Sequence, residues 1–254
     1  MKIVSFNIRS VWDAPVDGEQ SFVYRKEFVL EKIRKEKPDI ICFQEIIDPM
    51  YDYLRKSLTE YTFLGHGRNY DFRGEGVYTA VLNEKVDVLG LDVFWMSNKP
   101  YVPASRLRGQ SLCPRTCVYT KLRIGKNIFN VFNLHLDHLA EAEKVRLKEI
   151  KIVYDYIEEK KIKEPMFILG DFNAVPDSDC ITYIKEKGFS DVTFESGFTF
   201  HNFKGEDYKN KIKIDYIFCN KKMFKKCCFV KKWDDFNGKV YLSDHYPLLA
   251  EFEM

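Results

Sequence analysis

The sequence lacks the features that mark several large classes of protein. No apolar run approaches the ~20 residues that a membrane-spanning helix requires, so we expect no membrane span. The 40 basic and 38 acidic residues leave a net charge of only +2, which argues against a polybasic nucleic-acid coat but not against a local basic face. A phosphate substrate would therefore be bound by a local site rather than by bulk charge.

Paired cysteines and an export signal are also lacking. The 7 cysteines are odd in number and lie mostly within apolar runs, which is typical of a reducing compartment rather than of a disulfide framework. Cys113 and Cys117 have no second pair or nearby histidine to complete a zinc site. Asn7 and Arg9 interrupt the apolar start before a signal-peptide core can form, so we expect a cytoplasmic protein.

No linker rich in proline, glycine or serine divides the chain, and no internal repeat is present, so residues 1–254 are expected to form one domain. The 21 Phe, 15 Tyr and 3 Trp residues supply enough apolar side chains for a core and exclude wholesale disorder.

Helices are expected at 24–36 and 141–159, and Asp48 and Pro49 are typical of the start of another helix. Strands are expected at 2–7, 39–44, 77–82, 86–95, 116–124, 128–136, 166–169, 212–219 and 248–252. This excess of strands favours packed sheets with helices outside.

Polar side chains lie near the ends of several of these strands, where side chains collect around a cleft. The residues concerned are Asn7, Gln44, Glu45, His135, Asp137, Asp171, Asn173, Asp215, Asp244 and His245. Hard divalent cations prefer carboxylate oxygens, and magnesium commonly combines one or two carboxylates with substrate phosphates. Asparagine and histidine suit the developing charge of a phosphodiester, and a histidine oriented by an aspartate can activate water.

Each of these residues has a structural alternative when it is taken alone. Asn7 is compatible with a turn, and Glu45 with a helix cap or a solvated position. Asp215 stands between apolar neighbours, where an unpaired buried carboxylate is costly, so it is harder to explain without a function. His138 is expected to be a surface or hydrogen-bonded histidine.

The string GDFN at 170–173 is the most specific motif. It follows NLH (133–135) and precedes IDYIF (214–218) and SDHYP (243–247). Together with FN (6–7) and QE (44–45), this ordered set resembles the DNase I-like endonuclease/exonuclease/phosphatase superfamily. The resemblance extends from residue 3 to residue 252, and the strings YRKEFVLEKIRKEKPDIICFQE and FWMSNKP are most similar to an uncharacterised bacterial subgroup.

The resemblance implies a four-layered α/β sandwich, in which two mainly antiparallel β-sheets pack face to face with helices outside. It also implies an enzyme that hydrolyses phosphoester bonds with Mg²⁺ or Mn²⁺, as a phosphodiesterase or nuclease, or as a phosphatase. Glu45 is similar to the principal metal ligand of the family, with Asn7 beside it and Asp244 as a further ligand.

The same resemblance suggests catalytic roles. His245, held by Asp215, would activate the water or stabilise the phosphorane, and Asp171 is the alternative base. His135 and Asn173 would bind the oxygens of the scissile phosphate.

Two substrate-side features are less well defined by the resemblance. Arg115 is similar to a recurrent basic residue of the subgroup and would contact substrate phosphate, with a plain surface salt bridge as the alternative. A Glu or Tyr from the region 66–78 usually joins the site, and Glu75 and Tyr78 are both candidates.

The substrate class stays open between a nucleic acid, a nucleotide and a small phosphate ester such as a sugar or lipid phosphate. A non-catalytic binding or scaffold domain that retains the fold is the alternative from another class. That alternative predicts erosion of the metal and base positions, which are intact in this sequence. We expect the protein to be a monomer.

Overall fold

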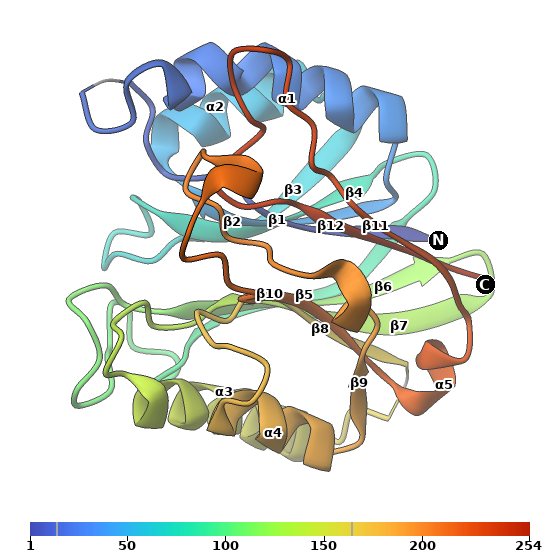
Figure 1. Cartoon of the computed structure of the whole chain (residues 1–254). Helices are drawn as coiled ribbons and strands as arrows, with labels where there is room; N and C mark the ends of the chain where they lie inside the picture. Colours follow the sequence, from blue (N-terminus) through green and yellow to red (C-terminus); the bar gives the residue numbers. More distant parts are fainter. Residues whose placement is uncertain (14, 164) are drawn as a thin grey trace.

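Two β-sheets of six strands each pack face to face in a computed structural model that describes residues 1–13, 15–163 and 165–254 (Figure 1). The strand orders are β11-β12-β1-β2-β4-β3 and β5-β6-β7-β8-β10-β9. The first sheet consists of β1 (Lys2–Asn7), β2 (Ile40–Ile46), β3 (Tyr61–Gly67), β4 (Gly76–Leu82), β11 (Cys227–Lys232) and β12 (Leu248–Phe252). The second consists of β5 (Asp87–Trp95), β6 (Thr116–Ile124), β7 (Asn127–His135), β8 (Met166–Asp171), β9 (Phe189–Asp191) and β10 (Asp215–Asn220).

Helices cover the outer faces of both sheets. The first sheet carries α1 (Phe22–Glu36) and α2 (Asp48–Ser57), and the second carries α3 (Glu143–Glu159) and α4 (Asp179–Glu186), while the short α5 (Lys221–Phe224) follows β10 (Figure 1). Only the pairs β1–β2 and β7–β8 are parallel among the paired strands of the described residues. The expected four-layered α/β sandwich is therefore confirmed. None of the described helices has the length and apolar character needed to cross a bilayer.

The predicted elements differ from the observed ones mainly at their ends and at the sheet edges. The helix predicted to have Asp48 as its N-cap and Pro49 at its first position begins one residue earlier, at Asp48 itself, with Ile47 as its N-cap. The strand expected from residue 212 begins only at Asp215, because the segment before it packs as a loop over the cavity described below. The edge strands β3, β9 and β11 were not predicted, since partly exposed edge strands show weak alternation.

The strand register brings the polar strand ends to one edge of the sandwich. Asn7 of β1 lies opposite Gln44 of β2, and His135 of β7 lies opposite Asp171 of β8. Asp215 at the start of the antiparallel strand β10 also lies opposite Asp171. Because the carboxyl ends of parallel strands point the same way, both parallel pairs deliver their last residues to the same region.

A glycine allows β7 and β8 to approach each other closely at this edge. Gly170 has φ 142°, a conformation that L side chains rarely adopt, and a Cβ built on it would collide with the carbonyl oxygen of Leu134 on β7. The glycine of the GDFN motif is therefore required where His135 meets Asp171.

A β-bulge in β2 turns Glu45 out of the regular ladder. The pairing of β2 with β4 shifts register between Phe43 and Ile46, and Glu45 has φ 65°. Asn133, on β7 of the opposite sheet, donates from Nδ2 to the carbonyl oxygens of Phe43 at 3.2 Å and Tyr78 at 3.0 Å. Its Oδ1 accepts from Gln44 Nε2 at 2.8 Å, so a buried amide pair joins the two sheets beside Glu45.

Candidate active site

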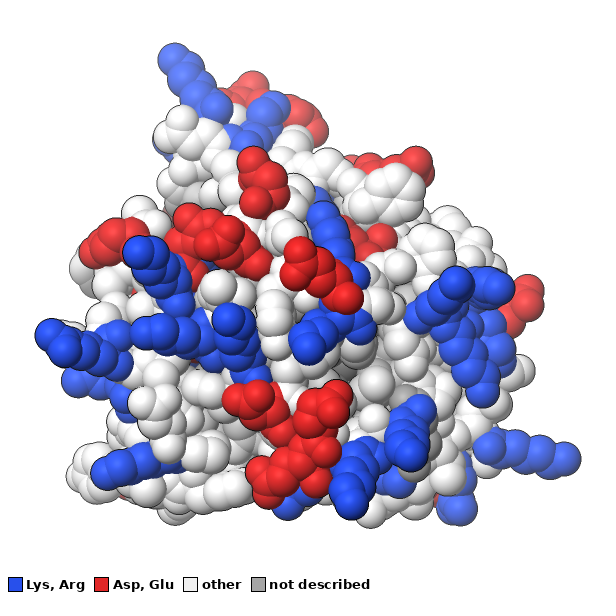
Figure 2. All heavy atoms as spheres, turned by 90° about the horizontal axis from the view of Figure 1, so that it is seen from below, with Lys and Arg blue, Asp and Glu red and all other residues white. Residues whose placement is uncertain are grey.

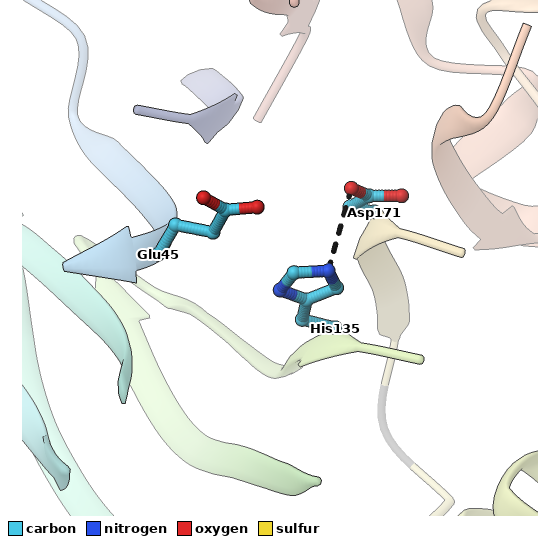
Figure 3. Close-up of side chains that lie close together, drawn as sticks. All are labelled: Glu45, His135 and Asp171. Carbon is cyan, nitrogen blue, oxygen red and sulfur yellow. Dashed lines mark ion pairs between the residues drawn. The ribbon is translucent and has the colours of Figure 1, made fainter. Parts of the chain in front are cut away.

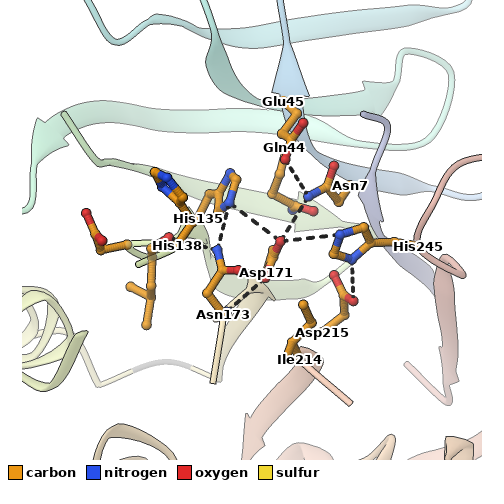
Figure 4. Close-up of polar contacts among 12 residues, drawn as sticks. Asn7, Gln44, Glu45, His135, His138, Asp171, Asn173, Ile214, Asp215 and His245 are labelled. Atoms are coloured by element: carbon orange, nitrogen blue, oxygen red, sulfur yellow. Dashed lines mark hydrogen bonds and ion pairs between the residues drawn. The ribbon is translucent and has the colours of Figure 1, made fainter. Parts of the chain in front are cut away.

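The polar strand ends meet at a cavity of about 420 Å³. The predicted residues that line this cavity are Glu45, Glu75, Arg115, His135, Asp171, Asn173, Asp244 and His245. Asn7 and Asp215 lie directly behind the lining and hydrogen-bond to it (Figure 4). The structure therefore brings together residues that are up to 238 positions apart, from Asn7 to His245.

Asp171 lies at the centre of this cluster (Figure 4). Its Oδ2 accepts a hydrogen bond from Asn7 Nδ2 at 2.9 Å, and it lies 3.5 Å from His135 Nε2 and 3.8 Å from His245 Nε2. Burial and the neighbouring charge of Asp215 raise the pKa of Asp171 to about 7. A carboxyl group with a pKa in this range can exchange a proton near neutral pH.

Asp215 and His245 form a buried hydrogen-bonded pair. His245 Nδ1 donates to Asp215 Oδ2 at 2.8 Å, which leaves Nε2 on the side of Asp171. Burial opposes the charged form of the imidazole, but the charge and hydrogen bond of Asp215 raise the pKa of His245 to about 10. His245 is therefore a cation at neutral pH. The ring of Phe200 lies against it, with 5.0 Å between ring centroids.

Glu45 is held in its ionised form. Its Oε1 accepts from Asn7 Nδ2 at 3.1 Å, and its Oε2 accepts from the backbone N–H of Ser10 at 2.9 Å. Burial opposes ionisation, but the hydrogen bond from Asn7 and the charge of His245 lower the pKa of Glu45. Asn7 Oδ1 accepts from the backbone N–H of Arg9 at 3.0 Å, so the nitrogen of this amide faces the carboxylates.

The donor set fits a hard divalent cation. Glu45, His135 and Asp171 each offer a ligand atom within 4.8 Å of the other two (Figure 3). Asp244 lines the same cavity, and burial followed by the charge of Glu45 raises its pKa. Carboxylates gathered in this way repel one another, and a divalent cation between their oxygens relieves that repulsion.

His135 is held neutral in a defined tautomer. Burial and the charges of Arg115 and Arg68 lower its pKa well below the ordinary value. Asn173 Nδ2, which can only donate, lies 3.0 Å from His135 Nε2 and 3.1 Å from the carbonyl oxygen of Leu136. His135 Nε2 therefore accepts, and the ring proton resides on Nδ1.

Three basic residues of the cavity lining were not predicted to belong to the site: Arg9, Arg68 and His138. His138 is hydrogen-bonded, as expected, but its partner is Arg115 and it lines the cavity. Arg115 itself is only 3% exposed, and no ion pair involves it among the described residues, so it does not form a plain surface salt bridge. Arg115 follows a loop with few apolar residues, so the sequence pattern did not predict that its side chain is buried.

The choice between Glu75 and Tyr78 is decided by their positions. Glu75 lines the cavity, where it forms an ion pair with Arg68. Tyr78 is buried in the core of the first sheet and packs on Tyr51, with 4.9 Å between ring centroids. Of these two candidates, Glu75 is therefore the one that lines the cavity.

Residues 4–245 match the profile of the Endonuclease/Exonuclease/phosphatase family, so the chain belongs to this family. Its members are phosphoester hydrolases that generally use a divalent metal ion. The chain is also similar to tyrosyl-DNA phosphodiesterase 2 of Mus musculus, at 26% identity over 136 residues, which is 54% of this chain and 32% of that protein.

Solved structures resemble the whole fold. A functionally unknown conserved protein from Enterococcus faecalis is 27% identical with a TM-score of 0.89, covering 100% of this chain and 99% of that one. A mannosyl-6-phosphatase from Bacteroides thetaiotaomicron is 22% identical with a TM-score of 0.90, covering 100% of both chains. The second likeness concerns the fold alone.

Proposed function

We propose that this protein is a phosphoester hydrolase that uses Mg²⁺ or Mn²⁺, and that residues 1–254 form one catalytic domain. The observation that carries the proposal is the position of Asp171, whose Oδ2 lies within 3.8 Å of polar atoms of Asn7, His135 and His245. These residues come from three distant segments of the chain, and a structural role alone gives no reason to gather them around a cavity.

Glu45 would be the principal ligand of the ion, with Asn7 beside it and Asp244 as a further oxygen donor. The bound ion would polarise the phosphoester and neutralise charge on its oxygens. The hydrogen bonds of Glu45 to Asn7 and Ser10 support this role, because they fix the carboxylate and keep it ionised. The bulge that turns Glu45 toward the cavity supports it further.

The remaining residues would bind the substrate and move the proton. His135 and Asn173 would bind oxygens of the scissile phosphate once substrate replaces the hydrogen bond between them, and Arg115 would bind substrate phosphate. His245, which Asp215 keeps protonated, would stabilise the charge that develops on the phosphorane. Asp171 would accept the proton of the attacking water, since burial and the charge of Asp215 raise its pKa to about 7 and it forms no ion pair with lysine or arginine among the described residues.

The substrate class is proposed to be either a phosphodiester or a small phosphate monoester. The similar protein from Mus musculus is by name a phosphodiesterase, and the one from Bacteroides thetaiotaomicron is a sugar phosphatase. A cavity of about 420 Å³ is of a size that suits a small ligand. On the face that carries α3 and α4, described Lys and Arg side chains lie among groups of Asp and Glu (Figure 2).

Hydrolysis of bis-p-nitrophenyl phosphate and of p-nitrophenyl phosphate, in Mg²⁺ or Mn²⁺ and in excess chelator, tests the proposal. We expect turnover only with metal, and a loss of roughly 100-fold or more in Glu45→Gln and in His245→Ala. Glu84→Gln is the matched control, because Glu84 is an exposed carboxylate paired with Lys37, and it should retain full activity.

Two results would contradict the enzymatic function. The first is the absence of metal-dependent turnover by folded wild-type protein on either ester and on a panel of DNA, RNA, nucleotides and sugar or lipid phosphates. The second is unchanged turnover in both site variants. The first result would favour a non-catalytic binding or scaffold domain that retains the fold, and the second would show that this cavity is not the source of the turnover.

A further inference from the structure

Arg115 is a buried cation that forms no direct ion pair among the described residues, although the charges of Glu75, Asp137 and Glu149 act on it from a longer distance. The residue is 3% exposed and lines the cavity of the candidate active site. Its Nη2 donates to His138 Nδ1 at 2.7 Å, and its Nε has no hydrogen-bond partner among the described residues. Because a guanidinium can only donate, His138 accepts through Nδ1 and is itself neutral. A buried charge without a counter-ion is unfavourable, so an anion at this position would be stabilised.

The other two arginines of the cavity differ from Arg115 in this respect. Arg9 Nε forms an ion pair with Asp17 Oδ2 at 2.9 Å. Arg68 forms an ion pair with Glu75. Of the three arginines that line the cavity, only Arg115 has no carboxylate within ion-pair distance in the described part of the chain.

Basic residues predominate in the part of the cavity around Arg68, Arg115 and His138, its basic end, and carboxylates predominate around Glu45 and Asp244, its acidic end. Each end also holds a residue of the opposite charge, since Glu75 pairs with Arg68 and Arg9 Nε lies 3.7 Å from Asp244 Oδ2. Arg115 contacts His138, and its charge contributes to the low pKa values of both His135 and His138. At the acidic end, the charge of Glu45 raises the pKa of Asp244. The acidic end suits the cation and the phosphate that is hydrolysed, so the basic end is available for another group.

We propose that Arg115 and His138 bind a second phosphate-type oxyanion of the substrate, distinct from the phosphate that is hydrolysed. This inference rests on the proposed function and specifies its substrate class: a phosphoester that carries an additional phosphate. A cavity of about 420 Å³ offers space for more than one phosphate group. The additional group can be the neighbouring phosphate of a nucleotide or the second phosphate of a sugar bisphosphate, which present the same chemistry to a guanidinium.

Sulfate binding measured by isothermal titration calorimetry in excess chelator tests the site independently of catalysis. We expect Arg115→Gln to bind sulfate at least about tenfold more weakly than the wild type, as loss of a charge-assisted hydrogen bond predicts. Arg123→Gln is the matched control, because Arg123 is an exposed arginine paired with Asp87, and its affinity should be unchanged. No sulfate binding by the wild type, or equal binding by folded Arg115→Gln, would overturn the proposal.

A second variant keeps the test decisive if Arg115→Gln does not fold. Glu75→Gln removes the partner of Arg68 and makes the basic end more positive. We expect this variant to bind sulfate more tightly, by roughly threefold or more. Unchanged or weaker binding would contradict an anion site at this end of the cavity.

Matched substrates then identify the source of the second phosphate. The p-nitrophenyl ester of thymidine 5′-phosphate is compared with the same ester carrying a 3′-phosphate, and glucose 6-phosphate with glucose 1,6-bisphosphate. We expect the extra phosphate to raise kcat/KM by roughly tenfold in one of the two pairs, and by less than about twofold in Arg115→Gln. No preference in either pair would overturn the proposal. Sulfate binding without hydrolysis of any ester would instead contradict the proposed function and leave the anion site supported.

Discussion

The buried amide pair of Gln44 and Asn133 should control both stability and the position of Glu45. Asn133→Leu removes three hydrogen bonds, two from Nδ2 to the carbonyl oxygens of Phe43 and Tyr78 and one from Gln44 Nε2 to Oδ1. At about 1 kcal/mol for each bond, with a further ~1–2 kcal/mol for a buried group left without its partner, the free energy of unfolding should fall by about 4–5 kcal/mol.

Urea unfolding followed by tryptophan fluorescence measures this loss. Asn83→Leu is the control, because Asn83 is an exposed asparagine whose side-chain hydrogen bonds lie at the protein surface. This variant should change the free energy of unfolding by less than about 1 kcal/mol. A double-mutant cycle with Gln44→Leu sharpens the test. The double variant should be less destabilised than the sum of the single variants by about 1 kcal/mol or more, because it leaves no amide of the pair without a partner.

Strict additivity, or a loss below about 1 kcal/mol in Asn133→Leu, would refute the reasoning. The variant should also bind Mn²⁺ more weakly, since the hydrogen bonds that it removes lie at the bulge that carries Glu45. An affinity for Mn²⁺ equal to that of the wild type would show that the amide pair does not position this carboxylate.

Three further predictions follow from the same geometry. Gly170→Ala should cost more than about 2 kcal/mol in urea unfolding, while Gly188→Ala, also at positive φ but in open space, should cost only about 1. Burial raises the pKa of Glu149 from 4.5 to about 7, so the folded state holds a proton that the unfolded state has lost. The free energy of unfolding should therefore fall by up to about 3 kcal/mol as pH rises through that range, and Glu149→Gln should flatten this decline between pH 5 and pH 8. Asp215→Asn should lower kcat by about 10²–10⁴-fold and lower the pKa of His245, measured by NMR; a rate within about threefold of wild type would contradict the assigned pair.

Local patterns along the chain predicted most of the central strands and the chemical groups at their ends. The strands 2–7, 116–124 and 248–252 occur with the predicted bounds, because each is a short apolar run. The alternation expected for 2–7 is not observed, since β1 lies inside the sandwich and is buried on both faces. The placement of His135 and Asp171 at strand ends follows from the same local pattern. The order of the motifs added the family, and with it the expectation of a metal-dependent site.

Only the tertiary structure decided which of these groups meet and in what state. The contact of Asn7 with Asp171 joins the two sheets, and no local pattern encodes the distance between residues 164 positions apart. The burial of Arg115, and the choice of Glu75 over Tyr78, depend on how loops and strands pack on one another. The pKa of Asp171 has the same origin, because it is set by burial and by the charge of Asp215, which is distant in the sequence but opposite in the sheet.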